Sequence, residues 1–180
     1  MKILHTADWH LGKIVNSVHM TEDQAYVLAQ LVDIVRHEKP DVIIIAGDIY
    51  DRSIPPKEAV ELLDRILTQL ITEFNSPILI ISGNHDSPDR LQFGSRLFRE
   101  NNLHIETKLT REMRSLTFDD QAGPVHFHLV PYIEPADART AFEDEEIQSH
   151  QQAMETIVSQ IKQRENMDER HVFIGHAFLA

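Results

Sequence analysis

Residues 41–51 read DVIIIAGDIYD, and their pattern indicates the fold class more clearly than any other segment of the chain. In its first part, Asp41–Ala46, the aspartate is followed by a continuous apolar run rich in β-branched side chains, which is typical of a strand buried on both faces. The run ends directly in Gly47 and Asp48. In open α/β sheets ligands collect at the carboxyl ends of the strands, so we predict a central strand that leads into a functional loop.

Strands and helices alternate on both sides of this stretch. Apolar runs predict strands at Lys2–Thr6 and Pro77–Ser82. Helical spacing of apolar residues begins at Thr21, which fits a capping box with Gln24, and begins again after Pro56. The alternation predicts an α/β fold with a central, mostly parallel sheet and helices on both faces.

The second half of the chain continues with shorter elements. A third helix is expected from Pro88, with Leu91, Gly94, Leu97 and Phe98 on its inward face. Ser149 is expected to cap a last helix. Four further strands are expected, and a turn between the second and third of them predicts a hairpin. These strands are Leu103–Thr107, Arg114–Phe118, Val125–Val130 and His171–Gly175.

The composition excludes several classes of protein. There is no cysteine, which excludes disulfides, thiolate zinc sites and cysteine nucleophiles. No apolar run approaches the roughly 18–20 residues of a membrane span, and the amino terminus offers no signal-peptide core. We therefore expect a cytoplasmic protein with no membrane partner.

The charge balance constrains any contact with nucleic acid. Lys and Arg number 17 against 29 Asp and Glu, so the net charge is 17 − 29 = −12. A protein that binds nucleic acid mainly by counterion release is expected to be basic. If this chain contacts DNA or RNA, then metals, a local patch or a partner must supply the positive charge.

Four of the predicted strands end in side chains suited to binding metals. Asp8 and His10 follow the first strand, Asp48 the second, Asn84 the third and His176 the last. Asp48 has two carboxylate oxygens and can bridge two ions. Oxygen and nitrogen ligands without thiolate favour manganese, iron, zinc or magnesium. We therefore predict a pair of divalent ions that clamps a phosphoryl group and lowers the pKa of a bridging water.

Other polar and aromatic residues near these motifs have less defined roles. His85 follows a ligand but projects differently, which suits protonating a leaving oxygen or stabilising a charged transition state. His5 is expected to be a hydrogen-bonded core residue, and His126 and His128 to share one face of a hairpin. Trp9 either stacks on a base or packs beneath its loop, and the sequence leaves both open.

The four motifs, in the order Asp-x-His, Gly-Asp-x-x-Asp, Gly-Asn-His-Asp and Gly-His, resemble those of the calcineurin-like metallophosphoesterases. The flanking residues, such as HTADWHLG at 5–12, are similar to the SbcD family of bacterial nuclease subunits. The resemblance implies the metallophosphoesterase fold and two divalent ions, manganese before iron, zinc or magnesium. It makes Asp48 the bridge and His85 the catalytic histidine, while Asp51 either tunes specificity or holds its loop. The implied metal ligands are Asp8, His10, Asp48, Asn84 and His176.

The same resemblance implies a function and partners. It implies a metal-dependent DNA exonuclease and endonuclease that cuts double-strand ends and hairpins in repair and recombination. An SbcC-type ATPase subunit and a second copy of the chain are the implied partners. Two alternatives stay open: a small-molecule phosphodiesterase or phosphatase of the same fold, mildly favoured by the net charge of −12, and a non-catalytic scaffold of a DNA-bound ATPase.

The sequence departs from the family pattern at its end. The family supplies two further imidazoles from a later Gly-His-x-His element, and this chain stops first, at Phe178–Ala180. We therefore expect residues 1–180 to be one metallophosphoesterase domain, truncated before that motif. Such a fragment is expected to retain metal weakly and to have little activity.

Overall fold

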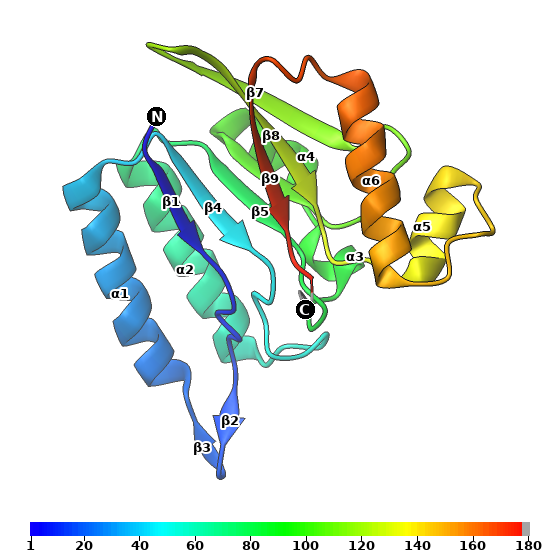
Figure 1. Cartoon of the computed structure of the whole chain (residues 1–180). Coiled ribbons are helices and arrows are strands. Elements are labelled where there is room, and N and C mark those ends of the chain that lie inside the picture. The colour runs from blue at the N-terminus through cyan, green and yellow to red at the C-terminus, as the bar shows by residue number, and fades with distance from the viewer. Residues whose placement is uncertain (178–180) are drawn as a thin grey trace.

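A computed structural model describes residues 1–177 of the chain, and two sheets packed face to face form its centre (Figure 1). The first sheet is entirely parallel, in the order β1-β4-β5-β6. In its register Ile43 of β4 pairs with Ile78 of β5, and both strands are buried along their whole length. Residues 41–51 therefore contribute the central strand that their apolar run predicts. The strands of this sheet are β1 (Ile3–Thr6), β4 (Val42–Ala46), β5 (Ile78–Ile81) and β6 (Leu103–Glu106).

Two long helices, α1 (Thr21–Glu38) and α2 (Lys57–Glu73), cover one face of the parallel sheet. Each presents an apolar stripe at helical spacing, and the stripe of α2 is buried throughout. These two helices are confirmed as predicted. The buried residues of the α2 stripe are Ala59, Leu62, Leu63, Ile66, Leu67 and Leu70.

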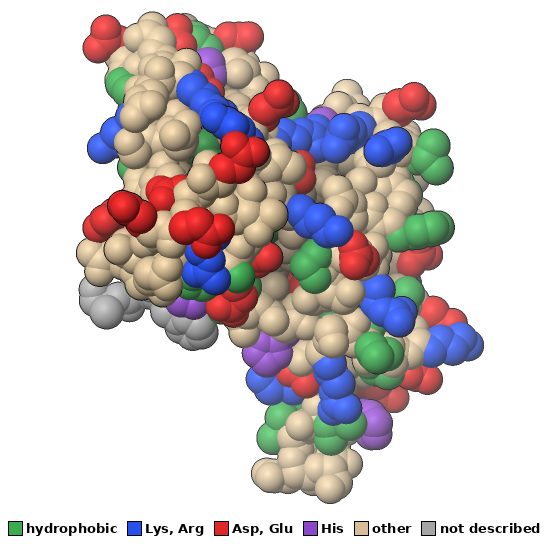
Figure 2. Space-filling model, turned by 90° about the vertical axis from the view of Figure 1, so that its right-hand side faces the viewer, with side chains coloured by type: hydrophobic (Ala, Val, Ile, Leu, Met, Phe, Trp, Pro, Cys, Tyr) green, Lys and Arg blue, Asp and Glu red, His purple; other side chains and the backbone are tan. Residues whose placement is uncertain are grey.

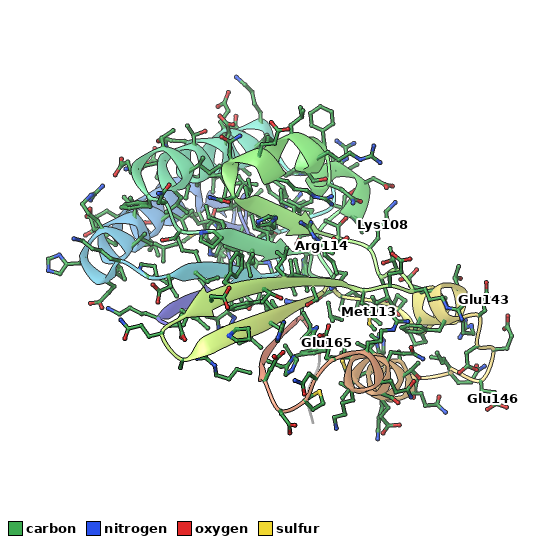
Figure 3. The ribbon with its side chains drawn as sticks, turned by 90° about the horizontal axis from the view of Figure 1, so that it is seen from above. Lys108, Met113, Arg114, Glu143, Glu146 and Glu165 are labelled. Carbon is green, nitrogen blue, oxygen red and sulfur yellow. The ribbon has the colours of Figure 1, made fainter. Side chains whose placement is uncertain are left out.

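The opposite face of the parallel sheet is covered by a second sheet, as the view from above shows (Figure 3). It consists of β7 (Arg114–Asp120), β8 (Gly123–Val130) and β9 (Arg170–Gly175). β7 and β8 form the predicted hairpin, and β9 pairs with β8 in parallel. The α/β fold is confirmed, but the prediction of helices on both faces is wrong. The reason is that Phe127 and its alternate neighbours on β8 pack directly onto the parallel sheet.

The outer side of the second sheet carries α5 (Pro135–Phe142) and α6 (His150–Arg164). Ser149 caps α6 as predicted, because its hydroxyl accepts the backbone N–H of Gln152 at 3.2 Å. The sequence did not predict α5. Glu143 and Glu146 project from the loop between the two helices, away from the sheets (Figure 3).

The third predicted helix is broken. It forms two single turns, α3 (Pro88–Leu91) and α4 (Ser95–Phe98), and a 3₁₀ turn follows at 99–101. The break is at Gly94, which has a φ of 75°. Leu91 is buried, but Leu97 is 73% exposed and Phe98 37% exposed. The expected inward face is therefore wrong for these two, because the helical period does not continue across Gly94.

A small hairpin precedes α1, and it was not predicted. Its strands are β2 (Ile14–Val15) and β3 (Val18–His19). The predicted capping box of Thr21 is also wrong, since its helix has no side-chain cap and Gln24 bonds to the loop after β1 instead. Among the described residues, no helix is both long and apolar enough to cross a membrane. The expectation about the chain's end, at Phe178–Ala180, falls outside the described part.

Candidate metal centre

The loops after β1 and β4 run side by side and form one wall of the centre. The N–H of Asp8 donates to the carbonyl of Gly47 at 3.1 Å, and the N–H of His10 donates to the carbonyl of Asp48 at 2.9 Å. Asp8, His10 and Asp48 have φ values of 56°, 45° and 50°. Residues other than glycine rarely adopt this left-handed region, and such strain concentrates at functional sites.

Two glycines allow these loops to approach one another. At Gly47, whose φ is 87°, a Cβ atom would overlap the ring of His176. At Gly83 a Cβ atom would overlap the carboxylate and backbone nitrogen of Asp48. Neither neighbour can retreat without moving a proposed ligand, so the glycine that precedes each motif is required by packing.

Asp48 lies at the middle of the centre and is only 4% exposed. Its Oδ2 atom is 3.5 Å from Nε2 of His10 and 4.0 Å from Nε2 of His85. Its Oδ1 atom is 3.6 Å from Nε2 of His176 and accepts the backbone N–H of His85 at 2.9 Å. The two oxygens therefore face different imidazoles, which is the geometry a bridging carboxylate needs.

His176 and Asn84 meet from the other side. Nδ1 of His176 is 2.9 Å from the carbonyl oxygen of Ala46. Because a carbonyl only accepts, Nδ1 carries the proton and Nε2 presents its lone pair. Nε2 lies 3.2 Å from Oδ1 of Asn84, which is also an acceptor. Two acceptors facing one another are the arrangement that a bound cation stabilises.

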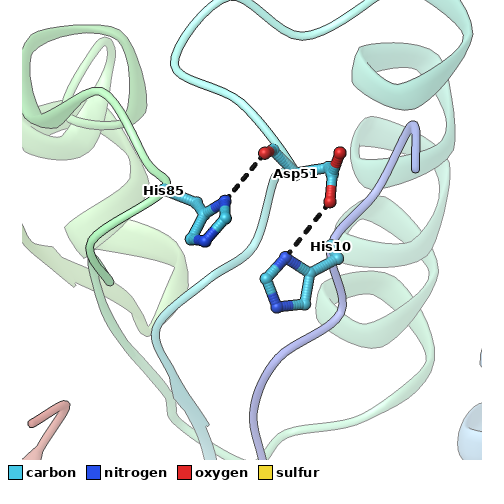
Figure 4. Close-up of side chains that lie close together, drawn as sticks. All are labelled: His10, Asp51 and His85. Atoms are coloured by element: carbon cyan, nitrogen blue, oxygen red, sulfur yellow. Dashed lines mark hydrogen bonds and ion pairs between the residues drawn. The ribbon is translucent and has the colours of Figure 1, made fainter. Parts of the chain in front are cut away.

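Asp51 supports both remaining histidines (Figure 4). Its backbone carbonyl is 2.9 Å from Nδ1 of His85, which turns Nε2 of that ring toward the cavity. Its Oδ1 atom is 3.5 Å from Nδ1 of His10, a buried nitrogen with no hydrogen bond. The rings of His10 and His85 meet edge to face, with centroids 4.8 Å apart. Asp51 therefore lies behind the two imidazoles and outside the cavity that they line.

Asp86 ties the loops of two strands together, a role that was not predicted. It is 6% exposed and accepts three backbone N–H groups, from Ile49 at 3.1 Å, Tyr50 at 2.9 Å and Gly83 at 2.9 Å. Burial raises the pKa of the Asp86 carboxyl, and the three donors oppose that effect. Burial and the charge of Asp86 raise the pKa of Tyr50 to about 12. The sequence feature that could have indicated this role is the position of Asp86 directly after His85, in the turn that follows β5.

All six residues singled out by the sequence line one cavity of about 480 Å³. Its donors are carboxylate, imidazole and amide groups, and among the described residues only histidines form ion pairs with Asp8 and Asp48. This unneutralised negative charge and the mixed oxygen and nitrogen donors fit divalent cations. The six are Asp8, His10, Asp48, Asn84, His85 and His176.

Three other histidines were expected to have structural roles. The expectation that His5 is a core residue is wrong, because β1 is an edge strand and His5 is exposed at the cavity. His126 and His128 do share one face of β8, where both rings stack on His171. They do not line the cavity.

Comparison of the sequence with known proteins shows which family the chain matches. The family model of the calcineurin-like phosphoesterases matches residues 1–178. The SbcD subunit of nuclease SbcCD from Staphylococcus saprophyticus is 39% identical over 176 residues, and that from Staphylococcus epidermidis is 40% identical over 178. Each match covers 98% of this chain and 46% of the relative. The chain thus spans about half the length of these curated relatives.

Proposed function

This chain belongs to the calcineurin-like phosphoesterase family, and from that premise we propose that it carries the metal centre of a DNA nuclease. The observation that carries the proposal is the placement of Asp48, whose two oxygens face imidazoles from different strands in one cavity. The likeness to two SbcD subunits of nuclease SbcCD supports the choice of DNA over other phosphodiesters.

The ligands of the proposed centre fall on either side of Asp48. Asp8 and His10 approach it from the loop after β1, and Asn84 and His176 from the loops after β5 and β9. Divalent ions held by these residues would stabilise negative charge on the phosphoryl oxygens and would lower the pKa of a water molecule. The ligand set suits manganese, with iron, zinc and magnesium as the other candidates.

His85 acts on the leaving group. Its Nδ1–H is donated to the carbonyl of Asp51, so Nε2 is the ring atom that faces the substrate. When both ring nitrogens carry a proton, the ring gives the Nε2 proton to the leaving oxygen or stabilises the charge that develops on it. Asp51 fixes the ring through its backbone and takes no part in proton transfer.

Because the chain is acidic, it needs another source of positive charge to bind DNA. The net charge is −12, and Figure 2 shows a face on which acidic and basic side chains are intermixed. The metal ions therefore supply part of the attraction for the phosphate backbone, and a second protein supplies more. We propose an SbcC-type ATPase as that partner, and double-strand ends and hairpins as the substrate.

The remaining parts of the proposal concern the assembly. We propose that residues 1–180 form the amino-terminal part of the nuclease domain, and that a Gly-His-x-His element follows with the last two imidazoles. Phe93, Leu97 and Phe98 are exposed apolar residues on α4 and the turn before it, at 84%, 73% and 37%. A homodimer that buries them would remove this apolar surface from water.

The test uses a polypeptide continued past Ala180 to the length of the relatives, with manganese. Linear duplex DNA and an aryl phosphodiester are assayed side by side, with Asp48→Ala as the control. Cleavage of DNA that disappears in Asp48→Ala is the expected result. Turnover of the aryl ester with intact DNA favours the second candidate, a small-molecule phosphodiesterase, which the net charge also favours.

A further inference from the structure

A second hollow lies against the metal centre on the far side of Asp8. It has a volume of about 380 Å³ and lies between the loop after β1 and the first half of α1. Ala7 and Asp8 line both hollows. Building on the proposed function, we propose that this second hollow binds the base of the nucleotide whose phosphate lies at the metal centre.

The walls of the hollow suit a flat apolar ring. Trp9, Val27 and Leu31 line it, and Val27 is 60% exposed although it is apolar. Nε1 of Trp9 donates to the hydroxyl of Thr6 at 2.9 Å. The polar edge of the indole is therefore satisfied within the protein, and the ring contributes apolar surface. Stacking of bases on aromatic side chains tolerates every base because each has a π-face.

The charged groups of the hollow select the base over the phosphate. Its two ionisable residues are Asp8 and Asp23, and no Lys or Arg is among the described residues that line it. The carboxylate of Asp23, which is not a proposed metal ligand, repels a phosphate but accepts hydrogen bonds from the exocyclic amino groups of adenine, cytosine and guanine. The phosphate then remains on the metal side of Asp8.

The hollow is held in shape by Gln24. Its side-chain amide donates to the carbonyls of Trp9 at 3.0 Å and His10 at 2.7 Å, and its oxygen accepts the N–H of Gly12 at 3.1 Å. One side chain thus fixes both the Trp9 wall and a proposed metal ligand. A wall that needs no rearrangement loses little conformational entropy on binding.

The experiment uses the fluorescence of Trp9, which is the only tryptophan of the chain. Adenosine 5′-monophosphate and ribose 5-phosphate are titrated with magnesium present; both carry the phosphate, but only the first carries a base. We expect saturable quenching by adenosine 5′-monophosphate alone. Val27→Glu places a larger charged group at the hollow and should weaken that binding by about tenfold.

Ile34→Glu is the matched control, because Ile34 is also an exposed apolar residue of α1 and does not line the hollow. Equal quenching by the two phosphates, or equal affinities of Val27→Glu and Ile34→Glu, would overturn the inference. Hydrolysis of an aryl phosphodiester without a base tests the proposed function separately. Hydrolysis without base-dependent quenching would support the proposed function and contradict only the base site. Quenching without hydrolysis in the extended polypeptide would contradict the proposed function, and therefore also the role of the hollow in it.

Discussion

Asp86→Asn is the change that tests most sharply how the loops of the centre are held. The Oδ2 atom of Asp86 accepts the N–H groups of Ile49 and Gly83, and Oδ1 accepts that of Tyr50. Asparagine has one acceptor oxygen, so its amide can satisfy one side of this arrangement and must turn an NH₂ group toward the other.

The magnitude follows from these three bonds. One N–H left buried and unsatisfied costs about 1–3 kcal/mol, and bonds to a neutral acceptor are each about 1 kcal/mol weaker than bonds to a carboxylate. Burial desolvates the Asp86 carboxylate and raises its pKa. The neutral amide of asparagine avoids this desolvation penalty, which offsets part of the cost. The net expectation is a loss of about 2–4 kcal/mol in the free energy of unfolding.

Urea unfolding measures this loss directly. With a slope of about 2 kcal/mol per molar urea, the midpoint should fall by about 1–2 M. Asp89→Asn is the matched control, since Asp89 is exposed three residues away and its pair with Lys108 is a surface one, worth about 0–1 kcal/mol. Equal midpoints for Asp86→Asn and Asp89→Asn would show that the three bonds to Asp86 do not hold the loops together.

Contacts elsewhere in the chain lead to three more expected outcomes. Asp120→Asn should reduce the loss of folding stability at acid pH. Arg170 and the amino terminus lower the pKa of Asp120 in the folded protein below its value in the unfolded chain. The stability that Asp120 contributes is therefore present above about pH 4 and is lost as the pH falls through the folded pKa. Urea midpoints at pH 7 and pH 3 check this, and an unchanged pH dependence contradicts it. Gly83→Ala should abolish manganese binding, measured by calorimetry, because its Cβ would displace Asp48; wild-type affinity would contradict the packing argument. His85→Ala should keep the metal but lower the turnover of an aryl phosphodiester by about 10²–10⁴-fold, whereas loss of metal would make His85 a ligand.

The convergence of the site was predictable because it rests on topology. A parallel sheet brings the carboxyl ends of its strands to one edge, so Asp8, Asp48 and Asn84 had to approach one another once their strands were recognised. His176 follows β9 of the second sheet, and it joins them because β9 packs against β4. The types of the proposed ligands then followed from the residues at each strand end.

The features that were not predictable depend on long-range packing. The alternation of apolar residues along β8 predicts that the face of the strand that carries Phe127 is buried, but it does not predict that a sheet covers this face. The Thr21 and Gln24 pattern fits a capping box, yet the side chain of Gln24 forms its hydrogen bonds with the loop after β1. His5 reads as a core residue until the strand order places it at an edge.

If Asp48 bridges two divalent ions in one cavity, then the number of manganese ions bound per chain reveals it. Electron paramagnetic resonance of free manganese, in titrations of the polypeptide continued past Ala180, gives the number of ions bound per chain. We expect two ions per chain and weakened binding of both in Asp48→Ala, because the two oxygens of Asp48 face His10 and His176. Two ions held with unchanged affinity in Asp48→Ala would contradict it.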